Sequence, residues 1–394
     1  MSPSPVTFGL PTQPATYSWE ATDEEVAARY GLAVDDILRF DLNTSPAPPD
    51  LVARVLAEGA FHTPLSEYPP ADYRRLVEAA ARAYKVEPDE LLVGAGADEI
   101  LDLIGKVFVP PGGRAVIPVP TYAMYRVVTE QRGATAVLVP RLGPAAGYAL
   151  DVPAVRAAAA PADLVWLCSP NNPTGLAEPA GTIANLLAAI DRDAAAAGRP
   201  APIVVLDEAY AEFVGSSLVG LRTDHSNLVL VRTASKAYAL AGLRVGFAVA
   251  QRETIARIAP YRPPGSVSTI SVTVVTEALT DPRGMAANVA RVDAERDRLA
   301  VGLRRAGWSV GPSVTNFLLV DFGTTDRAAA VAVALLRRGL VPRTFGAGHP
   351  LAHALRLTIR DRIGNDRLID AAEAIERDVE PAAPEDHRPA GGPR

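Results

Sequence analysis

Two residues in the sequence, a lysine and an aspartate, each follow a strand-like apolar run and could take part in chemistry. Lys236 comes after the run 228–231, so a strand would deliver its amine into a turn, where it could form a Schiff base. Asp207 ends the run 203–206, and a carboxylate there loses its water unless it meets a cation such as a protonated ring nitrogen. A helix N-cap is the alternative interpretation of Asp207.

The segment 94–99, Gly-Ala-Gly-Ala-Asp-Glu, lies between a short apolar run and a helical stretch. Its backbone N–H groups and the helix N-terminus could hold a phosphate, although a plain structural turn is the alternative. The dinucleotide spacing Gly-x-Gly-x-x-Gly is absent, because position 99 is Glu. A lysine amine, a buried carboxylate and a phosphate nest are the three fixed points that pyridoxal phosphate needs, so these residues predict that cofactor.

The elements that must position these groups alternate along the chain. Strand-like apolar runs are separated by Ala- and Leu-rich helical stretches, at 91–93, 115–117, 136–139, 164–168, 203–206 and 228–231. This alternation predicts an α/β fold with a mainly parallel sheet and helices on both faces. Ligands bind beyond the carboxyl ends of such strands, so we expect the polar residues that follow them to share one edge.

Composition changes along the chain predict two domains with less ordered ends. Residues 1–40 are expected to be a partly disordered N-terminal arm, and residues 380–394 a disordered tail, because both ends are rich in small residues and proline. We expect residues 61–290 to form a large cofactor-binding domain. Residues 41–60 and 291–379, which contain a long amphipathic stretch followed by separate strands, are expected to form a smaller α+β domain.

The overall composition narrows the classes of partner. With 39 basic and 45 acidic residues, the chain of 394 residues has a formal net charge of −6, and it shows no basic cluster. Nucleic acid and membrane are therefore not expected as partners. A single cysteine, Cys168, fits a reducing cytoplasmic compartment and is read as a buried inert thiol. The histidines offer one helix-like pair, His349 and His353, without a matching carboxylate, so we expect no metal site.

Six motifs in order carry a family resemblance over about residues 41–377. The sequence resembles the fold type I, class I/II pyridoxal-phosphate aminotransferases, and among them the histidinol-phosphate aminotransferase group. The motifs are the segments 94–99, 120–125, 170–175, 207–213, 235–244 and 355–358.

The resemblance implies the roles of residues around the cofactor ring. Lys236 would hold the cofactor as a Schiff base and then shuttle the substrate proton. Asp207 would keep the ring nitrogen protonated, while Asn172 and Tyr210 would bind the phenolic oxygen. Tyr122 would stack on the ring, although it could also be an ordinary core residue.

The resemblance also implies which residues bind phosphate and substrate. The cofactor phosphate would be held by Ala97, Asp98, Thr233, Ser235 and Arg244; Thr233 and Ser235 could instead be turn residues, and Arg244 a surface cation. The substrate contacts would come from Arg356 on the α-carboxylate, Arg343 on the substrate's own phosphate, and Asn43. Tyr68 would reach the cofactor phosphate of a partner subunit, which implies a homodimer.

Three positions depart from the pattern of the family. The segment 42–48 lacks the family's glutamate, so a side chain other than imidazole could be recognised. Gly265 and Ser266 replace a Tyr-Asn pair and would open one wall of the site. Arg360 replaces a glycine, and it is either a surface cation or a binding group for an acid.

The leading hypothesis is an enzyme of histidine biosynthesis that converts L-histidinol phosphate and 2-oxoglutarate into imidazole acetol phosphate and L-glutamate. One alternative is an aromatic or broad-specificity aminotransferase with the same machinery. A second is a lyase similar to threonine-phosphate decarboxylase. A cofactor-binding regulatory domain would need a fused DNA-binding segment, and the residues before the family match are not basic.

Overall fold

The predicted strands form one mixed, mainly parallel sheet in a computed structural model that describes residues 15–59, 61 and 63–379. The order of the strands across the sheet is β2-β8-β7-β6-β5-β3-β4. Only β8 runs antiparallel to its neighbours, and the other pairs are parallel. The bounds are β2 (Leu91–Gly94), β3 (Arg114–Val119), β4 (Thr135–Pro140), β5 (Leu164–Cys168), β6 (Ile203–Asp207), β7 (Leu228–Thr233) and β8 (Gly246–Val249).

Helices cover both faces of this sheet, which confirms the predicted α/β fold class. Successive strand residues enter different cores: Leu91 and Val93 pack into one, and Leu92 into the other. The first core is completed by α3 (Arg74–Tyr84), α6 (Val152–Ala159), α7 (Thr182–Ala196) and α10 (Thr269–Thr280), and the second by α4 (Gly96–Phe108), α5 (Met124–Gln131) and α9 (Arg252–Ile258). Strands buried on both faces need mostly apolar side chains, and β5 and the run 228–231 of β7 are both apolar and buried.

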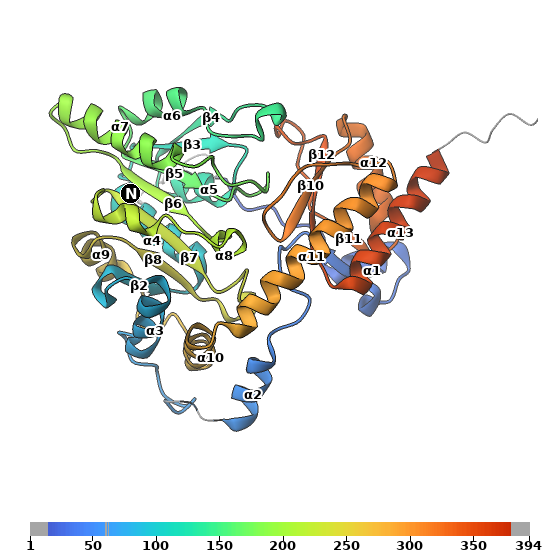
Figure 1. The fold of residues 1–394 in the computed structure, drawn as a ribbon, viewed down its shortest axis with the longest axis horizontal. Helices are drawn as coiled ribbons and strands as arrows, with labels where there is room; N and C mark the ends of the chain where they lie inside the picture. The colour runs from blue at the N-terminus through green and yellow to red at the C-terminus, as the bar shows by residue number, and fades with distance from the viewer. Residues whose placement is uncertain (1–14, 60, 62, 380–394) are drawn as a thin grey trace, which may run out of the picture.

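A smaller α+β lobe lies beside the sheet (Figure 1). Its core is built by α11 (Arg283–Arg305), α12 (Thr325–Leu336), α13 (Arg362–Val379) and an antiparallel sheet of β9 (Ser309–Val310), β10 (Phe317–Asp321) and β12 (Ala354–Thr358). A second, parallel pair joins β1 (Leu38–Phe40) to β11 (Leu340–Pro342). Phe213 of the short helix α8 (Ala211–Val214) belongs to the larger lobe but packs into this core.

Several elements lie at or across the domain boundaries expected from the sequence. Residues 23–40, expected within the N-terminal arm, form α1 (Asp23–Tyr30) and β1, because Thr22 and Glu25 cap the helix and β1 pairs with β11. α2 (Asp50–Glu58), expected in the small domain, packs on α10 in the larger lobe. α11 passes through the expected boundary at 290/291 without a break. Residues 1–14 of the expected arm and the expected tail 380–394 lie outside the described residues.

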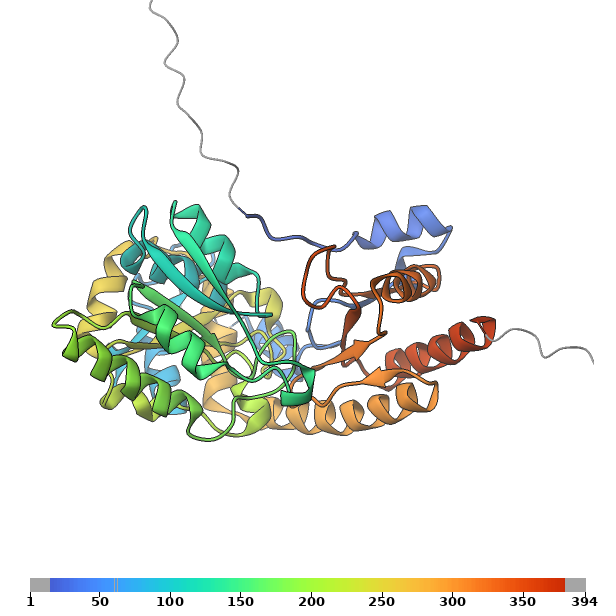
Figure 2. The ribbon, with the colours of Figure 1, turned by 90° about the horizontal axis from the view of Figure 1, so that it is seen from above.

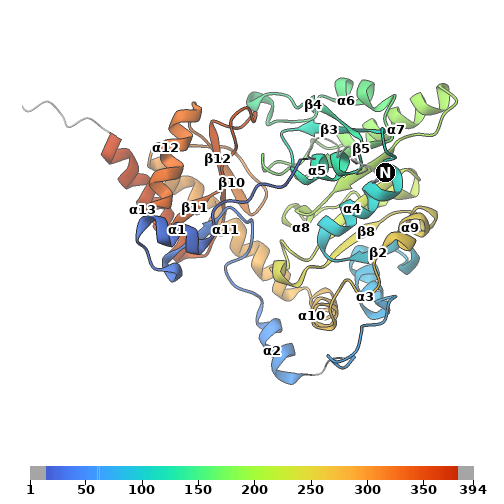
Figure 3. The same cartoon turned by 180° about the vertical axis from the view of Figure 1, so that it is seen from behind.

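The segment 15–20 crosses from one lobe to the other. The backbone N–H of Ala15 donates to Glu130 of α5 (3.0 Å), whereas Glu20 accepts from the backbone of Thr344 in the smaller lobe (2.8 Å). Figures 2 and 3 show the chain running along this path into α1. Among the described residues, no helix is long and apolar enough to cross a membrane.

Candidate active site

A cavity of about 620 Å³ lies where the two lobes meet. It is lined by almost all of the residues that the sequence predicted, the exception being Tyr68: Asn43, Ala97, Asp98, Tyr122, Asn172, Asp207, Tyr210, Thr233, Ser235, Lys236, Arg244, Arg343 and Arg356. Parallel strands bring several of these together, because the register aligns the ends of β5 and β6 at Cys168 and Asp207. The structure therefore gathers in one place residues that lie more than 300 positions apart in the sequence.

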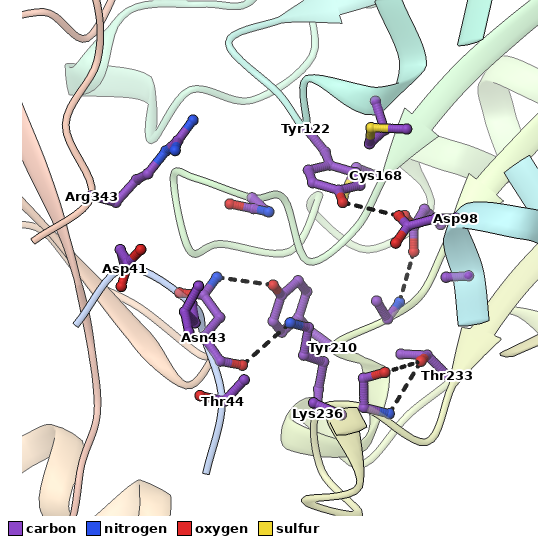
Figure 4. Close-up of a pocket in the computed structure, with 18 of the residues that line it drawn as sticks. Asp41, Asn43, Thr44, Asp98, Tyr122, Cys168, Tyr210, Thr233, Lys236 and Arg343 are labelled. Carbon is purple, nitrogen blue, oxygen red and sulfur yellow. Dashed lines mark hydrogen bonds between the residues drawn. The ribbon is translucent and has the colours of Figure 1, made fainter. Parts of the chain in front are cut away.

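Lys236 extends from the turn that follows β7, and the turn is closed by a hydrogen bond from Leu240 N–H to the Ala234 carbonyl (3.2 Å). The Lys236 Nζ donates to the backbone carbonyl of Asn43 (3.3 Å), as Figure 4 shows. Burial lowers the pKa of Lys236 to about 8, and the Arg356 guanidinium also lowers it. A neutral, nucleophilic amine is thus available near physiological pH.

Asp207 is buried at the end of β6 and accepts two hydrogen bonds. Its Oδ1 accepts from the Ala209 N–H (2.9 Å), and its Oδ2 from the Tyr125 hydroxyl (2.8 Å). Burial raises the pKa of Asp207 to about 6, and the hydrogen bond from Tyr125 opposes this shift. The carboxylate is therefore mostly ionised at pH 7, where it can bind a buried cation.

Tyr210 and Asn43 are connected beside the lysine. The Asn43 side-chain amide donates to the Tyr210 hydroxyl oxygen (3.0 Å), and the Asn43 N–H donates to Thr358 (2.9 Å). Because Tyr210 accepts this bond, its own hydroxyl proton is free to donate elsewhere. Burial also raises the pKa of Tyr210, which keeps the phenol protonated.

A cradle of donor groups lies at the N-terminus of α4, where no side chain caps the helix. Gly96 has φ +85°, and a Cβ at this position would stand 2.4 Å from an Arg244 Nη atom. Glycine is therefore what allows the guanidinium to approach the first turn, where backbone N–H groups have no helical partner. Arg244 donates to Asp98 (3.0 Å), and the Tyr122 hydroxyl donates to the other oxygen of Asp98 (3.0 Å).

Thr233 and Ser235 lie on the lysine side of this cradle. The Thr233 hydroxyl donates to the Ser235 hydroxyl (3.0 Å), and Ser235 N–H donates to Thr233 Oγ1 (3.1 Å). These bonds fix the two hydroxyl groups at the end of β7. Backbone N–H groups, two hydroxyls and a guanidinium are the donors that a phosphate group requires.

Two arginines stand on the smaller-lobe side of the cavity. Arg356 is buried and donates to the Asn172 side-chain oxygen (2.6 Å) and to the Asp41 carbonyl, while its Nε has no partner among the described residues. Burial lowers the pKa of Arg356. Arg343 donates to the Ser18 carbonyl (2.6 Å), and its backbone pairs with that of Arg356. Glu20 Oε1 lies 3.7 Å from Arg343 Nη1, so an acidic group of a ligand would share this guanidinium with Glu20, whereas the Arg356 guanidinium has no carboxylate of the described residues in its hydrogen bonds.

Some residues that line the cavity were not predicted. Tyr17 and Trp19 come from the N-terminal segment, and the Tyr17 ring contacts both Trp19 and Tyr122 edge to face. The signal in the sequence was two aromatic residues at alternate positions, but nothing local indicated that this segment reaches the site. Asp41, Leu42, Thr44, Met124, Ala209 and Ala241 also line the cavity.

Four residues singled out in the sequence lie away from this cavity. Tyr68 is 90% exposed, and a Cβ on Gly265 would lie 3.5 Å from its ring. The Ser266 hydroxyl donates to Glu99 (3.0 Å) near the start of α4. Arg360 hydrogen-bonds through its backbone to Asn365 (2.9 Å) and does not line the cavity.

Cys168 lines the cavity but is not poised for nucleophilic chemistry. It is buried, and burial raises the pKa of its thiol to about 12. A thiol with so high a pKa carries almost no thiolate at neutral pH. Within the described part of the chain, no group of three or more His, Cys, Asp or Glu residues could hold a metal ion.

The donors in the cavity fit pyridoxal phosphate. The amine of Lys236 can engage an aldehyde, the carboxylate of Asp207 a protonated ring nitrogen, and the cradle at Gly96 a phosphate. The two arginines lie beyond these groups and can bind an acidic substrate.

Comparisons with known proteins agree with this geometry. The sequence profile of the family "Aminotransferase class I and II" matches residues 36–371. The histidinol-phosphate aminotransferase of Symbiobacterium thermophilum is 36% identical over 89% of this chain and 93% of its own, and that of Roseiflexus castenholzii is 34% identical over the same shares. The crystal structure of histidinol-phosphate aminotransferase from Sinorhizobium meliloti with pyridoxal-5'-phosphate superposes with a TM-score of 0.81 at 26% identity, over 92% of this chain and 96% of that one.

Proposed function

The chain belongs to the class I and II aminotransferase family, and we propose that it is a cytoplasmic histidinol-phosphate aminotransferase of histidine biosynthesis. The reaction would convert L-histidinol phosphate and 2-oxoglutarate into imidazole acetol phosphate and L-glutamate. The observation that carries the proposal is the placement of Lys236 in a cavity with two arginines, Arg343 and Arg356. Histidinol phosphate brings one dianionic phosphate, and 2-oxoglutarate brings two carboxylates, so both substrates of the exchange need cations at this end of the site.

Pyridoxal phosphate, when bound, supplies an aldehyde that receives the amino group and a protonated ring that accepts the electrons left on the substrate α-carbon. Lys236 would hold the aldehyde through Nζ, and Asp207 would hold the ring nitrogen. Asn172 and Tyr210 would donate hydrogen bonds to the phenolic oxygen, and Tyr122 would pack against the ring. The phosphate would lie among Ala97, Asp98, Thr233, Ser235 and Arg244, whose donors converge at the start of α4.

Other steps of the reaction, namely proton transfer, substrate binding and the exclusion of water, would depend on residues of the chain. The amine of Lys236, once released, would accept the proton from the substrate α-carbon, a role that its lowered pKa of about 8 supports. Asn43 orients Tyr210 by donating to its oxygen, so the Tyr210 proton points away from Asn43. Arg356 would bind the α-carboxylate of glutamate, and Arg343 the substrate phosphate. The segment that carries Tyr17 and Trp19 would limit the entry of water from one side.

One observation favours a second candidate function. The Tyr17 ring contacts the rings of both Trp19 and Tyr122 at the wall of the cavity. An aromatic wall of this kind would also accept a phenyl or phenol ring. An aromatic amino acid aminotransferase with the same catalytic residues is therefore the alternative.

A spectroscopic half-reaction separates these candidates. The purified, cofactor-loaded protein is mixed in turn with histidinol phosphate, phenylalanine, tyrosine, glutamate and threonine phosphate, and the conversion of its visible band to the pyridoxamine form is followed. Rapid conversion by histidinol phosphate and glutamate alone is expected. Preference for an aromatic amino acid would favour the alternative, and release of carbon dioxide from threonine phosphate would indicate a lyase.

Two arginine variants test the phosphate contact. Arg343→Gln should raise KM for histidinol phosphate by about tenfold to a hundredfold, since hydrogen bonds to charged groups contribute that much. Arg360→Gln is the matched control, because Arg360 lies outside the cavity. An equal rise in both variants would contradict the assignment of Arg343.

The proposed active unit is a homodimer in which Tyr68 serves the cavity of the partner subunit. This is supported by the 90% exposure of Tyr68 and by the exposure of the apolar side chains Leu56 and Leu65. Subunit mixing tests it: Lys236→Ala and Tyr68→Ala chains, each impaired alone, should regain activity when mixed. One site of the mixed dimer would then hold both native residues, whereas a Tyr68 that acts within its own chain would give no recovery.

A further inference from the structure

Tyr125 is a buried residue that approaches the cavity from behind Asp207. It is the second residue of α5 and is fully buried. Its hydroxyl donates to Asp207 Oδ2 at 2.8 Å, while the Ala209 N–H donates to Oδ1 at 2.9 Å. An ionised carboxylate only accepts hydrogen bonds, so these two donors leave it with a fixed orientation and free lone pairs toward the cavity.

The ring of Tyr125 is held on two sides. It stacks on Trp166 of β5, with centroids 5.4 Å apart and planes 9° apart, and meets Tyr122 edge to face at 5.7 Å. The Trp166 indole N–H donates to the Thr129 hydroxyl (3.1 Å), which in turn donates to the Tyr125 carbonyl (2.7 Å). The hydroxyl oxygen of a ring held in this way cannot move away from the carboxylate without disturbing the core.

We propose that Tyr125 is a positioning residue that fixes the Asp207 carboxylate, and keeps it ionised, for the ring nitrogen of the cofactor. This inference rests on the proposed cofactor site, but it does not depend on which substrate the enzyme takes. Tyr125 touches neither substrate nor cofactor by this account; it acts through Asp207.

The charges around Asp207 agree with this role. Burial raises the pKa of Asp207 to about 6, and the hydrogen bond from Tyr125 is the largest influence that opposes it. The Ala209 N–H and the Lys236 ammonium also lower the pKa, whereas Asp98 raises it. Without the Tyr125 hydroxyl, burial would dominate further and a larger share of Asp207 would be protonated at neutral pH. A protonated Asp207 binds a protonated ring nitrogen weakly.

Tyr125→Phe removes the hydroxyl and keeps the stacked ring. We expect the apoenzyme to bind pyridoxal phosphate about tenfold more weakly, as for the loss of one charge-assisted hydrogen bond. In the loaded enzyme, kcat should fall while KM for both substrates stays unchanged. Tyr84→Phe is the matched control, because the Tyr84 hydroxyl is buried and has no hydrogen-bond partner in the described part of the chain. Its cofactor affinity should equal that of the native protein.

A double-variant cycle separates positioning from a general effect on folding. In an Asp207→Asn background, Tyr125→Phe should cause no further loss of cofactor affinity, because the residue through which it acts is already altered. Equal losses in both backgrounds, or no loss in the native background, would overturn the inference. A native apoenzyme that does not bind pyridoxal phosphate would instead overturn the proposed function.

A second measurement does not require the Tyr125 variant to fold. Proton NMR of the native apoenzyme should show a slowly exchanging phenolic proton, and Asp207→Asn should shift or remove this resonance. The absence of any phenolic proton that responds to Asp207→Asn would contradict the Tyr125–Asp207 contact.

Discussion

The pH at which the apoenzyme captures its cofactor tests the electrostatics of the site directly. Burial, together with Arg356, lowers the pKa of Lys236 to about 8. At pH 7 such an amine is about 9% neutral, against about 0.04% for a lysine with the ordinary pKa of about 10.4. Since the neutral amine is the nucleophile, attack at pH 7 should be about 200-fold faster than by an ordinary lysine of equal reactivity.

The assay mixes apoenzyme with pyridoxal phosphate in a stopped-flow instrument and follows the absorbance of the covalent complex from pH 6 to pH 10. The rate should rise with pH and level off above about pH 8, where the amine is neutral. Arg356→Gln removes a charge that lowers the Lys236 pKa, so the inflection should move to higher pH. Arg360→Gln serves as the control for the loss of a small-lobe arginine, and Lys236→Ala should give no covalent complex.

A rate that keeps rising to the ordinary lysine pKa would refute the reasoning, because it would mean that Lys236 is solvated. An inflection that stays in place in Arg356→Gln would show that burial alone sets the pKa. An equal shift of the inflection in Arg360→Gln would show that the effect is not specific to Arg356.

Three further outcomes follow from packing and burial. Gly96→Ala should weaken pyridoxal phosphate binding in an equilibrium titration, because its Cβ would stand 2.4 Å from Arg244. Gly112→Ala is the control: Gly112 has φ +76° and open space around it, so this change should lower stability without changing cofactor affinity. Equal affinities in the two variants would contradict the prediction. Glu178 forms a buried ion pair with Arg141, so Glu178→Leu leaves the Arg141 guanidinium without a counter-charge. The free energy of unfolding, measured with denaturant, should fall by about 3–5 kcal/mol. A loss near zero would mean that water reaches the pair. Cys168, with a pKa of about 12, should resist iodoacetamide at pH 8 in the folded protein and react after unfolding, so rapid alkylation of the folded protein would show that burial does not protect it.

Three groups on the cofactor side of the cavity could be predicted because each belongs to a local pattern, whereas the other cofactor contacts were implied by the family resemblance. Asp207 ends an apolar strand, Lys236 follows the next strand along the chain, and residues 94–99 separate a strand from a helix. Parallel pairing of neighbouring strands then forces their carboxyl ends to one edge. Local sequence and one topological rule were therefore sufficient to bring Asp207 and Lys236 together, whereas residues 94–99 reach them across the antiparallel strand β8, which lies between β2 and β7.

The contact between Tyr125 and Asp207 could not be predicted from local sequence. Its position in the segment 120–125 was visible, but its hydrogen bond to Asp207 of β6 depends on where the Tyr125 ring packs, and the ring stacks on Trp166 of β5. The packing of α2 on α10 is a similar case, because an amphipathic helix indicates that it has a partner without indicating which one.

The substrate side depends on contacts between the lobes, and no single element carries its signal. Arg343 and Arg356 belong to the smaller lobe, and Tyr122 to the larger one. Tyr17 lies on the segment 15–20, which is bonded at one end to Glu130 and at the other to Thr344. A change in how the lobes close would therefore move the arginines and the Glu20 end of the segment 15–20 relative to Lys236, while leaving Tyr122 and the cofactor donors of the larger lobe in place. It follows that relatives with the same strand-end residues can differ in substrate, and that specificity in this chain should respond to substitutions in 15–20 more than cofactor binding does.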